Sequence, residues 1–298
     1  MNENIVSIGE ILFDVYPAYK KLGGAPFNFI HHIWKLTGNG KFISRIGNDS
    51  NGKEILSFLT AINFDASYIQ TDDEHPTGTV NVKLRDDKTP DFIINKNTAY
   101  DFIEKNKSTD ELINSANIFY FGTLAQRNEK TRETIQSYFE RETKYFCDIN
   151  IRQDFYSAEL IKSCLKNSNV VKINSDELNI INYLLLNDNY DLDKSSEKLM
   201  REYNIDLLCV TMGEDGSLLL NQNERSKYCV KANSIVDTVG AGDAYAAVLC
   251  IGYLRNWSLE DINKIASEFA ADICGIEGAV PKNDNFYDKY RNAINNGS

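Results

Sequence analysis

Short apolar runs that end in polar or glycine residues recur along this chain, and their repetition is the strongest constraint on its fold. They occur at residues 4–12, 41–47, 116–124, 144–150, 169–178 and 206–216. A continuously apolar run is typical of a strand that is buried on both faces of a parallel sheet. Helix-like segments such as 129–142 and 195–204 lie between them. The alternation predicts an α/β fold with a mostly parallel sheet between two helical layers, whose ligands bind at the carboxyl ends of the strands.

Residues 77–87 depart from this pattern, because apolar and polar side chains alternate strictly there, and a second apolar run follows a turn at 86–90. Such alternation predicts an antiparallel hairpin with one face in water. We expect residues 75–100, together with residues 11–24, to form a small β-sheet lid that shuts a substrate away from water. A simple edge hairpin is the alternative.

The composition argues against several classes of protein. The 298 residues carry a formal net charge of −11, without the basic stripe that is usual in nucleic-acid binders. Neither a secretory leader nor an apolar run long enough to span a membrane is evident. The six cysteines are scattered, mostly in apolar runs, and are expected to be reduced core residues. We therefore expect a cytoplasmic protein that binds neither nucleic acid nor membranes.

The three histidines, His31, His32 and His75, lack the partners that a zinc site or a serine–histidine pair would need. His31 and His32 are adjacent, and adjacent residues do not share a helix face. We expect structural roles for both of them. Zinc enzymes and triad hydrolases are thereby disfavoured.

The stretch DTVGAGDAYAAVL, residues 237–249, places two glycines and an alanine directly before Asp243 and a run of small apolar residues. An aspartate in the first turn of a helix often does no more than face the positive end of the helix dipole. Small residues before it also let the backbone approach an anion with free N–H groups. Residues 234–239 resemble a strand end, and the order strand, turn, helix favours a phosphate cradle. Asp243 would then be a base, whose ionised form the helix N-terminus is expected to favour.

Two more polar clusters follow expected strands. Asn174 and Glu177 predict either a magnesium site that acts through water or a helix capping box. Asp148, Asn150 and Arg152 stand at alternate positions, so all three would point the same way. Arg152 would pair with Asp148 or with a phosphate.

The stretch GGAPFN places Gly23 and Gly24 in a tight turn before an expected helix. Asn28 in this stretch either caps that helix or hydrogen-bonds a ligand hydroxyl. Lys20 and Lys21 precede the turn in a polar segment and are expected to be solvated.

These motifs together resemble the ribokinase-like (PfkB-type) carbohydrate kinases. DTVGAGDAYAAVL is similar to the C-terminal signature of that family, and GGAPFN, NSDE, TMGEDG and GIEGAVP follow its order. Other stretches are similar to bacterial fructokinases, namely GEILFDVYP, KLGGAP, PTGTVNV, TAYDFI, FGTLAQR, FCDINIRQDFY and KINSDEL. At Ile30 the family pattern usually has a small residue, a departure that concerns the floor of the sugar pocket. The resemblance implies one ribokinase-like domain over residues 1–298, with a three-layer α/β/α core and the small β lid.

The resemblance also implies roles for individual residues. The implied base for the sugar hydroxyl is Asp243, beside an anion hole made by Gly240, Ala241 and Gly242. The implied sugar contacts are Asp14, Gly23, Gly24, Asn28 and Arg152. The implied nucleotide contacts are Asn174, Thr211, Gly213 and Gly216. Glu177 is implied to position Mg²⁺ through water, and carbonyls near Asp237, Val239 and Gly278 are implied to surround a monovalent cation such as K⁺.

We therefore expect an ATP- and Mg²⁺-dependent fructokinase that converts free fructose to fructose 6-phosphate. The alternatives are a related kinase for ribose, ketodeoxygluconate or a sugar phosphate, and an inactive sugar-binding relative. The presence of Asp243 with its glycines argues against the inactive relative. A phosphorylated substrate would need its own cluster of basic side chains, whereas Asp14 and Asn28 suit hydroxyl groups. Members of the family often pair through the lid, which predicts a homodimer.

Overall fold

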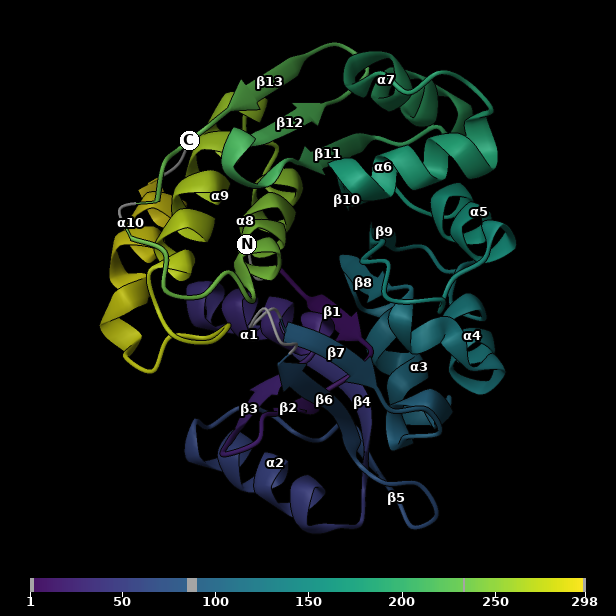
Figure 1. Ribbon diagram of the computed structural model, residues 1–298, viewed down its shortest axis with the longest axis vertical. Helices are drawn as coiled ribbons and strands as arrows, with labels where there is room; N and C mark the ends of the chain where they lie inside the picture. The colour runs from purple at the N-terminus through teal and green to yellow at the C-terminus, as the bar shows by residue number, and fades with distance from the viewer. Residues whose placement is uncertain (1–2, 85–89, 233, 297–298) are drawn as a thin grey trace.

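A nine-stranded sheet forms the centre of the protein (Figure 1). The computed structural model describes residues 3–84, 90–232 and 234–296. The sheet runs from one edge to the other through β13 (Arg225–Tyr228), β12 (Ser217–Leu220), β11 (Leu207–Thr211), β10 (Val170–Asn174), β9 (Lys144–Asp148), β8 (Ile118–Gly122), β1 (Ile5–Ile8), β4 (Lys41–Gly47) and β5 (Ile69–Asp72). All neighbouring strands from β11 to β5 are parallel, whereas β12 and β13 run antiparallel to their neighbours. The prediction of a mostly parallel sheet is confirmed.

Two helical layers cover the sheet, one on each face. The helices that share a core with one face are α1 (Ala25–Thr37), α2 (Ser50–Ala61), α8 (Ala241–Leu254), α9 (Leu259–Cys274) and α10 (Asp288–Asn296). Those of the other face are α3 (Lys107–Asn114), α4 (Glu129–Gln136), α5 (Ala158–Lys166), α6 (Ser175–Ile181) and α7 (Leu192–Tyr203). Short helical turns complete the chain, namely η1 (Ala99–Phe102), η2 (Leu124–Arg127), η3 (Asn182–Leu186), η4 (Gly213–Asp215) and η5 (Asp284–Tyr287). Strands such as β1 and β8 are buried along their whole length because helices cover both of their faces.

A separate four-stranded sheet lies beside the large one (Figure 1). Its strands in spatial order are β3 (Lys20–Gly23), β2 (Leu12–Val15), β6 (Gly78–Leu84) and β7 (Pro90–Ile94). The predicted antiparallel hairpin is β6–β7, with Val80 and Val82 buried. The alternative of a hairpin on the edge of the main sheet is wrong, because β6 pairs with β2. The predicted turn at residues 86–90 lies, apart from Pro90, outside the described residues.

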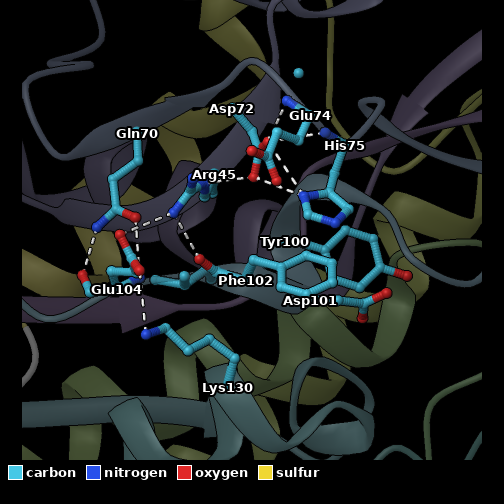
Figure 2. Close-up of polar contacts among 12 residues, drawn as sticks. Arg45, Gln70, Asp72, Glu74, His75, Tyr100, Asp101, Phe102, Glu104 and Lys130 are labelled. Atoms are coloured by element: carbon cyan, nitrogen blue, oxygen red, sulfur yellow. Dashed lines mark hydrogen bonds and ion pairs between the residues drawn. The ribbon is translucent and has the colours of Figure 1, made fainter.

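A polar cluster fastens the root of the small sheet to the large one (Figure 2). Arg45 on β4 forms an ion pair with Asp72 at the end of β5, with 2.7 Å between Nε and Oδ2. The Asp72 carboxylate also accepts the backbone N–H of His75, whose ring stacks on Phe102 at 3.6 Å. Tyr100 in the same short helix packs against Gly78, where β6 begins. The small sheet therefore starts from a fixed base.

The segment before α8 differs from the prediction. Residues 234–239 form no strand; Val236 donates its N–H to the Cys274 carbonyl, and the side chains of Ile235 and Val236 are exposed. Val236 and Asp237 both donate to the Cys274 carbonyl, so this segment is held as a loop against the end of α9. Within the described residues, no helix is long and apolar enough to cross a membrane.

Candidate active site

Asp243 lies in the first turn of α8, where this helix packs against α1. Asn28 on α1 donates from Nδ2 to Asp243 Oδ2 over 2.8 Å. Asn28 does not cap α1, since Gly24 is the N-cap residue, so that alternative is wrong. The other amide atom of Asn28, Oδ1, is buried and has no hydrogen-bond partner in the described structure. It is a free acceptor next to Asp243.

The glycines before Asp243 form the tight entry to α8. Gly240 has φ of 80°, and a Cβ there would overlap Ala279. A Cβ at Gly242 would lie 3.3 Å from Nζ of Lys172. The first N–H groups of a helix have no intrahelical acceptor, so this entry presents donors beside a carboxylate. The entry follows a loop and not the expected strand end, and the cradle stays a prediction.

Burial raises the pKa of Asp243 to about 7, and the negative charge of Asp148 acts in the same direction. The hydrogen bond from Asn28 and the charges of Lys172 and Arg152 oppose the rise without cancelling it. The expectation that the ionised form of this carboxyl is favoured is wrong, because burial raises its pKa. A carboxyl with this pKa accepts a proton readily near neutral pH.

The sequence analysis missed a second buried carboxyl, that of Glu10 between β1 and β2. Glu10 is 2% exposed, and burial raises its pKa to about 7. The charge of Asp243 raises it further, whereas Arg127 and Arg152 lower it. Two features of the sequence point to it: Glu10 directly follows an apolar run, and it lies in the fructokinase-like stretch GEILFDVYP.

Lys172 on β10 is the second residue that the sequence analysis missed. Its Nζ lies 2.9 Å from Oδ2 of Asp148 at the end of β9, and both side chains are buried. Tyr120 on β8 donates its hydroxyl to the same carboxylate over 3.1 Å. A lysine inside the apolar run NVVKIN was the available signal. The ion pair puts a buried positive charge directly beneath Gly242.

Lys172 also corrects the prediction for the end of β9. Asp148 pairs with Lys172 and not with Arg152, whose Nη1 donates to the Ile151 carbonyl. Asn150 adopts a left-handed φ of 47°, so the alternation ends at Asp148 and the three side chains do not share one direction. Arg152 is exposed, and its charge lowers the pKa of the Asp14, Glu10 and Asp243 carboxyls. The guanidinium of Arg152 therefore stabilises the ionised forms of these three carboxyls.

Asp14 reaches the site from the small sheet. It lies on β2, where a Cβ on Gly23 of the paired strand β3 would be 3.0 Å from its Oδ2. Burial, and then the negative charge of Asp237, raise the pKa of Asp14 to about 6. Gly24, which ends the same turn, has φ of 113° and lies against the Glu10 carbonyl, so a side chain would not fit there.

Lys20 and Lys21 on β3 are not simply solvated, contrary to expectation. Lys20 forms an ion pair with Glu54 on α2. Lys21 forms ion pairs with Asp237 and Glu277, at the other side of the site.

Asn174 and Glu177 form the capping box of α6. The Asn174 side chain accepts the N–H of Glu177, and Glu177 Oε2 accepts the N–H of Asn174, both over 2.8 Å. Glu177 Oε1 accepts a third N–H, from Ile151, over 2.7 Å. The capping interpretation of this motif is confirmed. Each carboxylate oxygen keeps a lone pair for a water molecule.

The remaining expected nucleotide residues surround the ends of β11 and β12. Thr211 ends β11, and its hydroxyl donates to the Ile173 carbonyl over 3.4 Å. Gly213 begins η4 and Gly216 follows it, with φ of 60° and 90°. Because Gly216 lies against the backbone of Tyr228, only glycine fits that turn.

Ile30, the histidines of α1 and the cysteines lie outside the group of residues around Asp243. Ile30 is fully buried in the hydrophobic core against Gly40. His32 bonds the Tyr287 hydroxyl and the Ala279 carbonyl, and His31 is buried beside it, in line with structural roles. The six cysteines are free; the exposed one is Cys229, and the others are buried or half-buried.

The three-layer core with a second small sheet is the architecture of the ribokinase-like kinases. The family model described as pfkB family carbohydrate kinase matches residues 2–285. The chain belongs to this family, and it is therefore a phosphotransferase that acts on a sugar hydroxyl group.

Individual relatives are distant. A fructokinase from Salmonella typhimurium is 26% identical, over 95% of both chains. The structure is similar to a sugar kinase from Pyrococcus horikoshii in complex with ATP, with a TM-score of 0.80, 24% identity and coverage of 97% of this chain and 99% of that one. It is also similar to a double mutant of a Vibrio cholerae fructokinase bound to fructose, ADP and potassium, with a TM-score of 0.77, 22% identity and coverage of 93% and 94%. These two structures support the fold.

Proposed function

We propose that the protein transfers the γ-phosphoryl group of ATP to free fructose and forms fructose 6-phosphate. The observation that carries this proposal is the buried Asp243 carboxyl, with a pKa of about 7, beside the glycine entry of α8. Asp243 removes the proton of the sugar hydroxyl as the oxygen attacks phosphorus. The backbone N–H groups at Gly242 and its neighbours stabilise the charge on the transferred group.

The sugar lies, in this proposal, between α1 and the small sheet. Asn28 Oδ1, Asp14 and Glu10 offer acceptors for its hydroxyl groups, and Gly23 and Gly24 let the chain approach closely. Arg152 supports the phosphate end. ATP lies along the carboxyl ends of β10 and β11, against Asn174, Thr211, Gly213 and Gly216. Pairing of two chains through the small sheet stays a prediction.

Mg²⁺ fits this site as an ion that keeps its water shell. Glu177 has both oxygens engaged by backbone N–H groups yet keeps free lone pairs, and Asp148 lies close enough to influence its pKa. Carboxylates of this kind hold Mg²⁺ through water, together with substrate phosphates. When bound, the ion would neutralise charge on the phosphates. Glu177 and Asn174 would hold its waters.

Glu177→Gln is expected to raise the Mg²⁺ concentration that gives half-maximal rate, and also to lower stability by about 0.5–2 kcal/mol. Glutamine has one acceptor oxygen, so either Ile151 or Asn174 loses its partner. Mg²⁺ titration of turnover and thermal unfolding measure the two effects. Glu159→Gln, an exposed first-turn residue of α5, is the control. A stability loss with unchanged Mg²⁺ dependence would leave Glu177 as a cap alone.

The charges favour an uncharged sugar. Three carboxyls, those of Asp14, Glu10 and Asp243, face this region. Arg127 pairs with Asp101 and Lys21 pairs with Asp237. Arg152, the further cation whose charge acts on all three carboxyls, is assigned to the transferred phosphate in this proposal. A substrate that carried its own phosphate would need unpaired basic side chains, because a buried anion must be compensated.

A coupled assay of ADP release over equal concentrations of fructose, ribose, ketodeoxygluconate, fructose 1-phosphate and fructose 6-phosphate tests the proposal. The highest kcat/KM is expected for fructose. A higher value for any other sugar would refute the specificity and retain a sugar kinase. No ADP release above the ATP-only rate with any member of the panel would leave the proposed reaction without support.

A further inference from the structure

Lys21 connects the small sheet to the loop that leads into the cradle. Its Nζ lies 3.2 Å from Oδ2 of Asp237 and 3.3 Å from Oε1 of Glu277. The Lys21 and Asp237 side chains are only 23% and 18% exposed, so solvent screens this pair less than an ordinary surface pair. The link joins segments that are 216 residues apart in the chain.

The Asp237 carboxylate organises the cradle loop. Its Oδ1 accepts the N–H of Val239, and its Oδ2 accepts the N–H of Gly278, each over 3.1 Å. Val239 directly precedes Gly240, which rests against Ala279, the neighbour of Gly278. The Asp237 carboxylate thus holds both backbone segments, at Val239 and at Gly278, that shape the entry of α8.

The N–H groups of Val239 and Gly278 and the charge of Lys21 together hold the pKa of Asp237 below its usual range, against the effect of burial. Burial is the main cause of the raised pKa of Asp14, and the negative charge of Asp237 raises it further. Lys21 is the direct cross-strand partner of Asp14 in the β2–β3 pair, and it also touches Asp237. Its charge therefore opposes the repulsion between a sugar-site carboxyl and the cradle-loop carboxyl.

The donor set also fits a monovalent cation. Asp237 and the backbone carbonyls of residues 237–239 and 278 are hard oxygen donors of the kind that such an ion uses. However, Oδ2 of Asp237 already accepts two donors, from Gly278 and Lys21. An ion that bound this oxygen would have to displace Lys21.

We propose that Lys21, on the small sheet, is a positioning residue. Its ammonium group takes the place beside Asp237 that a monovalent cation from solution would otherwise occupy. The small sheet then holds the cradle loop in its working shape when it lies over the site. Removal of Lys21 creates a demand for a monovalent cation that the natural protein lacks. This inference rests on the proposed phosphoryl transfer at Asp243.

Lys21→Met, compared with Lys20→Met, tests the inference. Lys20 lies next to it on β3 but pairs with Glu54 and Asn51, away from the cradle loop. Turnover is measured with the best sugar of the panel in KCl and in choline chloride at equal ionic strength. We expect kcat of Lys21→Met to fall by up to about 10²-fold in choline chloride, the scale of lost positioning. We expect KCl to restore much of it in a saturable way, and the natural protein and Lys20→Met to respond to KCl no more than to choline chloride.

A second readout does not depend on turnover. KCl, relative to choline chloride, is expected to raise the Tm of Lys21→Met and to leave the Tm of the natural protein unchanged. Lys21→Arg is expected to keep most of kcat without KCl. The inference is overturned if the natural protein itself needs K⁺, or if Lys21→Met keeps its kcat in choline chloride. It is also overturned if only KM rises and neither KM nor Tm responds to K⁺. An absence of turnover in the natural protein would instead count against the proposed function.

Discussion

Replacement of Asp243 by asparagine is expected to lower kcat by at least about 10²-fold, the scale on which a general base contributes. The amide keeps the size of the side chain. Its oxygen can still accept the hydrogen bond that Asn28 Nδ2 donates to Asp243 Oδ2 over 2.8 Å in the natural protein. Folding and sugar binding are therefore expected to persist. Sugar binding measured by calorimetry, together with single-turnover phosphorylation, separates the loss of chemistry from a loss of binding.

The pH profile of the natural protein gives an independent check on the same base. Asp243 acts only when it is ionised, and burial raises its pKa to about 7. The value of kcat/KM is therefore expected to fall as the pH drops through about 7. Glu10→Gln is expected to move this limb to lower pH, since it removes a negative charge that interacts with Asp243.

A matched control is available at the same position of another helix. Asp261 is the third residue of α9, as Asp243 is of α8, but it is exposed and only accepts the hydroxyl of its cap, Ser258. Asp261→Asn is expected to leave kcat unchanged and to cost little stability. If Asp243→Asn behaved like this control, Asp243 would have no part in the reaction.

The order of strands and helices was predictable because the burial of each element is visible in its own pattern of apolar and polar residues. A run such as IFYFG has no charged or amide side chain, as is typical of a strand with both faces covered, and β8 is fully buried. The alternation from Thr77 likewise gave the β6–β7 hairpin. Residues 234–239 were expected to end a strand, but the N–H groups of Val236 and Asp237 bond the Cys274 carbonyl at the end of α9. Local pattern carries no information about this contact.

The site was only partly predictable for a related reason. Asp243, Asn28 and the cradle glycines stand in motifs that suggest a role, whereas Glu10 and Lys172 lie in the stretches GEILFDVYP and KINSDEL, whose pattern suggests none for these two residues. The pKa of Asp243 depends on how completely α1 and β10 enclose it, and this enclosure is a property of the packed molecule. Lys21 meets Asp237 across 216 residues of chain, a contact that no spacing in the sequence records.

Lys172→Met is expected to destabilise the protein by about 3–5 kcal/mol, because it leaves the buried Asp148 carboxylate without its partner. Both side chains are almost excluded from water, and Nζ contacts both oxygens of Asp148, at 3.1 and 2.9 Å. Urea unfolding at neutral pH measures the change. Lys144→Met is the control, since its pair with Asp206 is exposed and long, at 3.4 Å, and exposed pairs contribute about 0–1 kcal/mol.

The double variant Asp148→Asn with Lys172→Met decides whether the stranded charge is the cause. The asparagine is neutral and can still accept the Tyr120 hydroxyl, so much of the lost stability is expected to return. Simple addition of the two single losses would show that packing and not charge is responsible. In this double variant, stability is expected to recover while kcat does not. Lys172 lies beneath Gly242, 3.3 Å from where a Cβ would stand, so the stable double variant is still expected to have low kcat. The buried ammonium is then part of the positive field under the phosphoryl cradle, and the protein tolerates the cost of burying it because Asp148 is paired with it.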